Sequence, residues 1–273
     1  MNVPEIIKSN IDKMTKSERA VATYFLENPN KFAFETLDSI AEIINTSTTS
    51  VLRFCRKNGF DGYKSFQDEI RKGFKYQFTL PDKFKTMSAS ADSQYALNAV
   101  NCIKNTFNNI PENIISLAAN EIADANRVFC FGLKESYAMA HYAYTRFLTV
   151  RNNVFMLSAG QCGEIESLLS LTKGDVCVFY LFHRYTKQSP QILNTLKKRG
   201  VTVILITSPP YDEVKNDAGF IIPCFVDING IKNSYAAPVC ITDCLCNCVV
   251  SKSGTKTLDY MKQSENLFEN FTF

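Results

Sequence analysis

The stretch that most constrains this chain runs from Leu37 to Phe60, with the sequence LDSIAEIINTSTTSVLRFCRKNGF. Its apolar residues recur at helical spacing in two short blocks, before and after the polar turn Asn45-Thr46-Ser47. Ser47 is a suitable N-cap for the second block, because its hydroxyl can accept a hydrogen bond from an orphan amide. Gly59 can end that second helix, because glycine tolerates a left-handed backbone. The pattern therefore predicts a helix-turn-helix motif.

The second helix of this motif carries side chains that suit a nucleic acid. No acidic residue lies between Glu42 and Asp61. Short hydroxyls fill the first turn, which in such motifs meets base edges, and the cations that follow can contact phosphates or guanine. The alternative is an ordinary solvated helix with a basic face. The candidate DNA-binding residues are Ser47, Thr48, Thr49, Ser50, Arg53, Arg56, Lys57 and, in the next helix, Lys64.

Residues 15–74 resemble the N-terminal domain of RpiR-type bacterial transcriptional regulators. The resemblance is carried by a long ordered run, which comprises Ser47, Ser50-Val51, Arg53-Phe54, Lys57, Gly59-Phe60 and Gly62-Tyr63. It implies a DNA-binding head followed by a sugar isomerase (SIS) domain that binds a sugar phosphate.

Length and composition are consistent with one large domain or two ordinary ones. The chain has 273 residues, of which 45% are hydrophobic and 21% charged, as in soluble globular proteins. A formal charge of +3 is too small to indicate nucleic-acid binding, so that prediction rests on local clustering. No signal sequence opens the chain, and no apolar run approaches about 18 residues. We expect a cytoplasmic protein with no membrane partner.

The ten cysteines lie mostly inside apolar runs, where a free thiol behaves as a small hydrophobic residue. Four of them gather in VCITDCLCNCVV. Cys244 and Cys248 would share a helix face, but Cys246 would point away from both. Because the ligand spacing of known zinc sites is absent, reduced core thiols are expected rather than a metal site. No cofactor is expected either.

Taken in order, the sequence predicts an all-α head over residues 1–76, a linker over 77–94 that can be partly helical, and an α/β domain over 95–273. In the head, Thr15 and Glu18 have capping-box spacing, and Phe32 and Phe34 are expected to fill the small core. In the second domain, apolar strand-like runs alternate with helices, which indicates a five-stranded parallel sheet flanked by helices. The strands are expected at 127–131, 153–156, 176–182, 201–206 and 219–222. Helices are expected from about Tyr95 through Ile103 and at 114–123, 136–149, 161–171, 188–199, 211–216, 235–251 and 255–269.

Ligands of open parallel sheets bind beyond the carboxyl ends of the strands, where helix N-termini favour anions. About Leu117 to Pro223 resembles an SIS domain, a fold similar to phosphosugar isomerases. The matching features are Gly132 and Ser136 of a first loop, Gly174-Asp175-Val176, Thr186 of a second loop, Gly200 and Ile206-Thr207. The candidate ligand-binding residues are Lys134, Ser136, His183, Arg184 and Thr186.

Departures from the SIS pattern leave the state of this site open. Lys134 replaces a glycine of the first loop, and Leu181, His183 and Arg184 replace two serines and a glycine of the second. Such side chains would occupy the space in which a glycine-rich loop binds phosphate through its backbone amides. Lys134, His183 and Arg184 could instead donate charge-assisted hydrogen bonds to an anion. The alternative is a degenerate pocket in a domain that only dimerises.

The preferred interpretation is a homodimeric or homotetrameric transcriptional regulator of carbohydrate metabolism genes, without enzyme activity. A sugar phosphate or similar anion would alter its affinity for double-stranded DNA. Glu135, Glu164 and His183 could act as bases for sugar isomerisation, but nothing in the sequence fixes them near a substrate. A phosphosugar isomerase with an accessory head, and a ligand-independent DNA-binding or scaffold protein, remain the alternatives.

Overall fold

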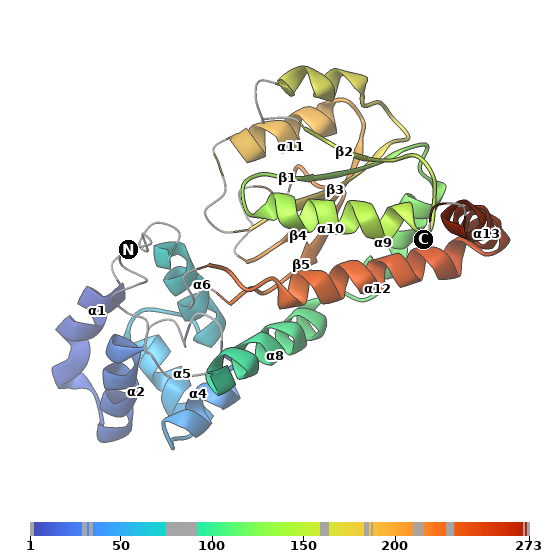
Figure 1. Ribbon diagram of the computed structural model, residues 1–273. Helices are drawn as coiled ribbons and strands as arrows, with labels where there is room; N and C mark the ends of the chain where they lie inside the picture. Colours follow the sequence, from blue (N-terminus) through green and yellow to red (C-terminus); the bar gives the residue numbers. More distant parts are fainter. Residues whose placement is uncertain are drawn as a thin grey trace. The chain divides into compact units, whose positions relative to one another are not determined.

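The computed structural model describes residues 3–28, 32, 35–74, 92–158, 164–182, 186, 188–209, 214, 216–227, 232–269 and 271 (Figure 1). The chain forms two compact units, Met1–Met87 and Ser88–Phe273, which are treated separately below.

The first unit is helical, as the sequence predicts. Its elements are α1 (Val3–Asn10), the 3₁₀ turn η1 (Ile11–Lys13), α2 (Lys16–Glu27), α4 (Leu37–Ile43), α5 (Thr48–Lys57) and α6 (Tyr63–Phe74). The expected capping box begins α2: the Glu18 amide donates to Thr15 Oγ1 at 3.4 Å, and the Thr15 amide donates to Glu18 Oε2 at 2.8 Å. The expected left-handed glycine follows α5, since Gly59 has a φ of 87°.

Aromatic rings fill the centre of the first unit. Phe66 of α6 is fully buried, and its ring centroid lies 5.3 Å from that of Phe25, 5.4 Å from that of Phe54 and 6.0 Å from that of Phe32. The pairs of Phe66 with Phe32 and Phe54 are edge-to-face, a geometry that contributes packing energy beyond the area buried. The prediction that Phe32 fills the core is therefore confirmed, whereas Phe34 lies outside the described residues.

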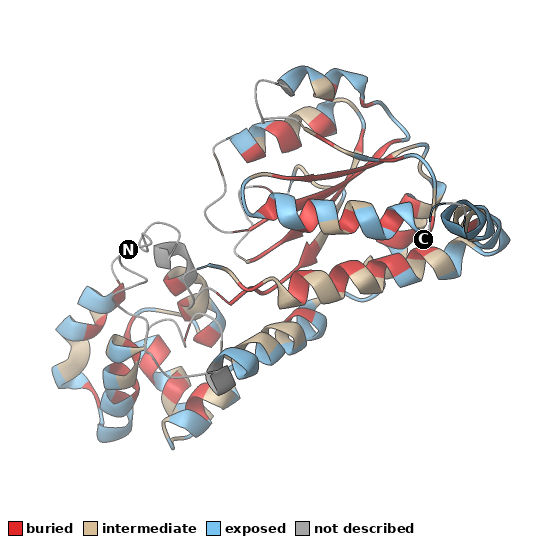
Figure 2. Cartoon of the chain, viewed as in Figure 1, coloured by how far each residue is buried: buried red, intermediate tan, exposed pale blue. Residues whose placement is uncertain are grey.

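The second unit is built on the predicted five-stranded parallel sheet. Its strands are β1 (Val128–Gly132), β2 (Val154–Met156), β3 (Val176–Leu181), β4 (Thr202–Thr207) and β5 (Phe220–Pro223), in the order β2-β1-β3-β4-β5. Every residue of β1 and β3 is buried (Figure 2). Such burial explains their continuous apolar sequence, because strands covered on both faces do not alternate.

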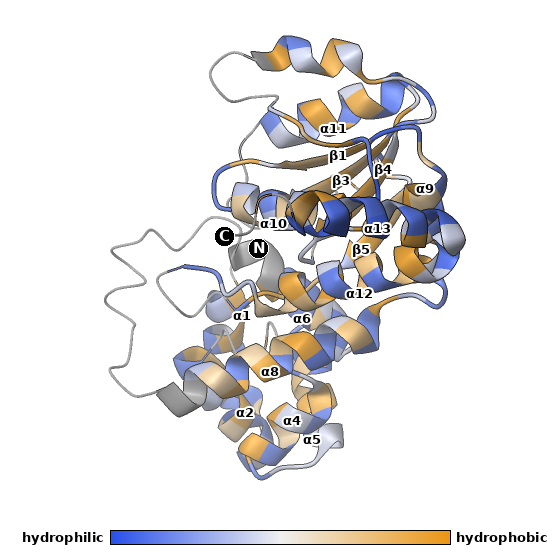
Figure 3. Ribbon diagram, turned by 45° about the vertical axis from the view of Figure 1, so that its right-hand side comes forward, coloured by the Kyte–Doolittle hydropathy of each residue, from blue (hydrophilic) through white to orange (hydrophobic). Residues whose placement is uncertain are grey.

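Helices cover both faces of this sheet (Figure 1). One face, which includes Val128 and Cys130, packs against α9 (Ile114–Asp124), α10 (Ser136–Leu148) and α12 (Ala236–Ser253). The other face, which includes Phe129 and Phe131, packs against α11 (Gln188–Lys198) and η2 (Glu164–Ser170). Figure 3 shows apolar colour along the strands and mostly hydrophilic colour on α13 (Thr255–Glu269).

Two expected elements differ from the structure. Within the helix expected at 161–171, the described residues Glu164–Ser170 form a 3₁₀ helix, and Leu168 in it and Leu171 directly after it are both buried. Residues three apart share a face of a 3₁₀ helix, which has three residues per turn. Helix α8 (Asp92–Asn109) begins at the end of the segment expected to be a linker, for which the sequence allowed a partly helical form. Most of the short helix expected at 211–216 lies outside the described residues.

The described cysteines are all free thiols. Cys55 in the head core, Cys130 and Cys177 on strands, Cys224 directly after β5 and Cys246 on α12 are buried. Burial raises the pKa of Cys55 to about 12, so its thiol stays protonated. Cys162 lies outside the described residues. Within the described part of the chain, no group of three or more His, Cys, Asp or Glu residues could hold a metal ion. A search of the same part finds no helix that is both long and apolar enough to cross a membrane.

Candidate functional site

Helices α4 and α5 form the predicted helix-turn-helix, and local hydrogen bonds define its turn. The Thr46 amide donates to Ala41 O at 2.9 Å, which ends α4, and Asn45 takes a left-handed φ of 53°. Ser47 is the N-cap of α5, because its Oγ accepts a hydrogen bond from the Ser50 amide at 3.2 Å. The hydroxyls of Ser47 and Ser50 also lie 2.9 Å apart.

The two faces of α5 differ sharply in chemistry. Val51, Phe54 and Cys55 are buried and fix the helix in the core of the first unit. The remaining candidate side chains on this motif reach solvent. Ser47, Thr49, Arg53 and Arg56 are exposed, Thr48 and Ser50 are half-buried, and Lys64 of α6 is exposed. Exposed hydroxyl and guanidinium groups of this kind can contact the base edges and phosphates of a duplex.

Lys57 differs from the other cations of α5. Its Nζ lies 2.6 Å from Glu18 Oε2 and 3.0 Å from the carbonyl oxygen of Lys13. Burial acts to raise the pKa of Glu18, but the hydrogen bonds from Lys57 and Thr15 outweigh it and the pKa is lowered. The charge of Lys57 is thus balanced inside the first unit.

In the second unit, the strand order reverses between β1 and β3. The loops after these two strands flank the position where sheets of this type bind ligands. After β1, Lys134 is exposed with a left-handed φ of 54°, and Ser136 is buried at the start of α10. A Cβ on Gly132 would lie 2.4 Å from the carbonyl oxygen of Ser136, so only glycine fits at the end of β1.

The loop after β3 is described only in part. His183 and Arg184 lie outside the described residues. Thr186 is half-buried, and its Oγ1 lies 3.2 Å from Ser189 Oγ in the first turn of α11. Ser136 and Thr186 therefore each lie at the start of a helix that follows one of the two strands at the reversal.

Comparison with known proteins assigns both units. The helix-turn-helix domain of the rpiR family matches residues 1–76, and the SIS domain matches residues 121–245. The chain is an RpiR-type transcriptional regulator. It is 24% identical over 280 residues to the HTH-type transcriptional regulator HexR of Escherichia coli strain K12, covering 100% of this chain and 96% of HexR.

Solved structures share the fold of this RpiR-type regulator. The NanR protein of Vibrio vulnificus, complexed with ManNAc-6P, superposes with a TM-score of 0.59 at 19% identity over 99% of each chain. The sugar isomerase domain of an RpiR transcription factor from Sphaerobacter thermophilus gives a TM-score of 0.60 at 17% identity, covering 64% of this chain and 97% of that one.

Sequence reasoning about this regulator missed a polar group beside the β1 loop. Lys232 forms an ion pair with Glu135, the N-cap residue of α10. Burial, followed by the charge of Glu135, raises the pKa of Tyr235 to about 12, although hydrogen bonding to Ser136 and Asn233 lowers it. These residues follow β5, about a hundred positions after the loop that they meet, and no motif marks them. Only the folded sheet places Lys232 and Tyr235 beside the β1 loop.

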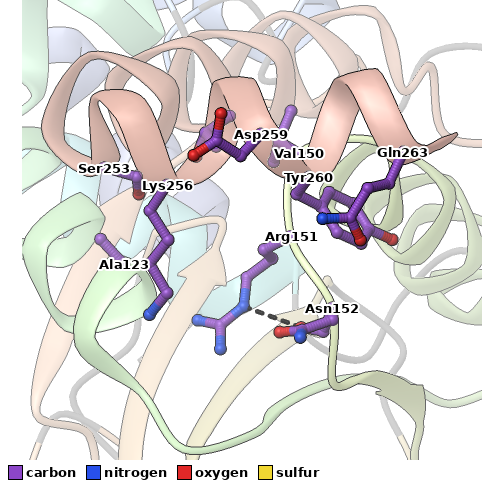
Figure 4. Close-up of a pocket in the computed structure, with 10 residues that line it drawn as sticks. Ala123, Val150, Arg151, Asn152, Ser253, Lys256, Asp259, Tyr260 and Gln263 are labelled. Atoms are coloured by element: carbon purple, nitrogen blue, oxygen red, sulfur yellow. Dashed lines mark hydrogen bonds between the residues drawn. The ribbon is translucent and has the colours of Figure 1, made fainter. Parts of the chain in front are cut away.

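A surface pocket of about 270 Å³ lies elsewhere on the second unit, between α13 and the segment that precedes β2 (Figure 4). The half-buried Arg151 lines it, and its Nη2 donates to the carbonyl oxygen of Ala125 at 2.7 Å. Burial lowers the pKa of Arg151. Arg151 donates its hydrogen bonds to carbonyl oxygens at the end of α9, and the pocket lies at the amino edge of the sheet. We therefore assign the pocket no part in effector binding.

Proposed function

We propose that this regulator reads double-stranded DNA with α5 and responds to a sugar phosphate at the carboxyl edge of its SIS sheet. One observation carries the DNA-binding part. The buried face of α5 fixes the helix, while Thr49, Arg53 and Arg56 remain exposed on its other face. In a helix-turn-helix, this is the arrangement that lets the second helix enter the major groove.

Three features support the effector part of the proposal. The strand reversal lies between the loops that carry Ser136 and Thr186. NanR, which shares the fold, was solved with ManNAc-6P, a phosphorylated amino sugar. Lys134, His183 and Arg184 supply cationic donors in place of the bare amides of glycine-rich loops. We therefore infer a phosphorylated sugar as the class of effector, bound by Lys134, Ser136, His183, Arg184 and Thr186.

The proposed assembly is a cytoplasmic homodimer or homotetramer. Residues 1–76 form the DNA-binding head, 77–94 the linker, and 95–273 the effector-binding and dimerisation domain. Two heads would contact half-sites of a palindromic operator, and the effector would act by binding the two head arrangements unequally. No catalytic step is assigned to the SIS domain, since a change in DNA affinity requires only binding.

A selection experiment tests this function. The full-length protein is used to select duplexes from a randomised library, and the affinity for the selected duplex is then measured with and without a panel of phosphosugars. We expect at least one phosphosugar, but not its unphosphorylated counterpart, to change the affinity and to raise the melting temperature. Failure to enrich any duplex would exclude the DNA-binding function, and turnover of a phosphosugar would instead favour an isomerase.

A further inference from the structure

The carboxylate of Glu18 joins the ends of two helices in the first unit. Its Oε2 accepts the Thr15 amide at 2.8 Å and the Lys57 ammonium at 2.6 Å. The first bond belongs to the capping box that begins α2, and the second comes from the last residue of α5. One oxygen atom therefore fixes the start of α2 and the end of α5 together.

The ion pair between Glu18 and Lys57 is partly shielded from solvent. Glu18 is only 4% exposed, and the Lys57 side chain is 31% exposed. Partly buried pairs are screened by salt less than surface pairs are. The third contact, from Lys57 Nζ to the carbonyl oxygen of Lys13 at 3.0 Å, restricts the ammonium further. A side chain so engaged is a poor candidate for a phosphate contact.

A neighbouring hydrogen bond anchors the same end of α5. Asn10 Nδ2 donates to Asn58 Oδ1 at 3.3 Å, and Asn58 Nδ2 donates to the carbonyl oxygen of Phe54 at 2.8 Å. Asn58 is buried and caps the C-terminus of α5. The other end of the helix is capped locally by Ser47. Polar contacts to the α1–α2 region are therefore concentrated at the C-terminal end of α5.

We propose that Lys57 and Glu18 are positioning residues for DNA binding, because their ion pair fixes the angle of α5 against α2. A ten-residue helix is about 15 Å long, so a tilt of roughly 10° about its C-terminal end would move the first turn by about 2–3 Å. Hydrogen bonds to base edges do not tolerate such a shift. Lys57 thus acts through Glu18 and makes no contact with the DNA backbone, an inference that rests on the proposed reading of DNA by α5.

The direction in which one substitution changes the DNA affinity distinguishes a positioning role of Lys57 from a direct contact with phosphate. Glu18→Gln retains a residue that can complete a capping box, but it removes the negative partner of Lys57. If Lys57 contacted phosphate, the freed ammonium and the added net positive charge would strengthen binding. If the ion pair positions α5, the same substitution weakens binding. Lys57→Met removes the charge at similar length, and Lys57→Arg keeps it.

The test measures the affinity of the full-length protein for the duplex that the wild type selects, over a series of salt concentrations. Circular dichroism fixes a temperature at which every variant is folded, so that reduced stability does not enter. We expect Glu18→Gln and Lys57→Met each to weaken binding roughly three- to tenfold, with the double variant no weaker than the worse single one. The slope of log affinity against log salt should not change in these variants, and Lys57→Arg should retain most of the wild-type affinity.

A control variant and the outcomes that would overturn the proposal complete the design. Lys8→Met removes an exposed cation of α1 and should leave the affinity within about twofold of the wild type. Tighter or unchanged binding by Glu18→Gln would overturn the proposal, as would a salt slope lowered by about 1 in Lys57→Met. A wild-type protein that enriches no duplex would overturn the DNA-binding function itself, which keeps the two failures distinguishable.

Discussion

Arg127 binds Asp175 with two nitrogens: Nε lies 3.0 Å from Asp175 Oδ1, and Nη2 lies 2.6 Å from Oδ2. The Thr172 amide donates to the same Oδ2 at 2.8 Å. The pair links the residue before β1 to the residue before β3, the two adjacent strands at the reversal of the sheet. Asp175 belongs to the Gly174-Asp175-Val176 run that resembles the SIS pattern. Because this run lies at the amino edge of the sheet, opposite the proposed effector site, we assign it a role in stability.

Asp175→Asn should destabilise the SIS domain by about 2–3 kcal/mol, because Asp175 is 1% exposed and Arg127 would lose its counter-ion. Thermal unfolding at neutral pH measures this change, and the exposed Asp124→Asn serves as its control. Equal melting temperatures for the two variants would show that the pair contributes nothing.

The same pair predicts a pH dependence. Burial acts to raise the pKa of Asp175, but hydrogen bonds from Arg127 and Thr172 outweigh it and lower the pKa below 3.8. A lowered pKa stabilises the fold at pH values above 3.8, and this contribution is lost as the pH falls through the folded-state pKa. The stability difference between wild type and Asp175→Asn should therefore be constant near neutrality and shrink below about pH 4. A difference that grows on acidification would contradict this assignment.

Gly132→Ala should distort the loop that begins α10. The added Cβ would lie 2.4 Å from the carbonyl oxygen of Ser136, a backbone atom that cannot rotate away. We expect a loss of about 1–3 kcal/mol in stability and a weaker response to the phosphosugar, because the loop and the start of α10 must separate. In Gly62→Ala the new Cβ would meet no atom within 4 Å, so this variant is the matched control. Retention of both stability and effector response in Gly132→Ala would argue against a tight β1 loop.

Arg53→Ala combined with Arg56→Ala should weaken DNA binding and make it less sensitive to salt. Removing one phosphate contact reduces the slope of log affinity against log salt by about 0.9, so removing two reduces it by about 1.8. Both side chains are exposed on α5. Lys173→Ala combined with Lys198→Ala removes the same charge from exposed positions of the SIS domain and should leave the slope unchanged. Identical slopes for the two double variants would exclude a specific role of α5.

Arg184→Ala should weaken the effector response while leaving the affinity for DNA without effector intact. The expected loss is about 2–4 kcal/mol of effector binding if Arg184 makes a charge-assisted pair with the phosphate. Titration of the phosphosugar against the protein–DNA complex measures it, with Lys198→Ala as the control. A response that is the same in both variants would remove Arg184 from the effector site.

The local sequence determined the helices and strands of this protein, because the capping residues and apolar patterns that indicate them lie within a few residues of one another. Thr15 and Glu18 are three residues apart, and Ser47 and Gly59 bracket one short helix, so capping chemistry alone places them. The parallel sheet also follows from sequence, since the continuous apolar runs of β1 and β3 require cover on both faces. The 3₁₀ form of 164–170 was not predicted, because the spacing of Leu168 in it and Leu171 directly after it fits either type of helix.

Only the tertiary structure decided what individual side chains do. Lys57 resembles the other cations of α5 in sequence, yet folding brings it to Glu18, which lies 39 residues earlier in the chain. Lys232 and Tyr235 carry no motif, yet they lie against the loop of Glu135 and Ser136 because β5 ends at the same edge of the sheet. Helix caps and apolar periods depend on near neighbours, and a sequence records those directly. Which distant charges meet depends on how whole elements pack, and that is settled only when the chain folds.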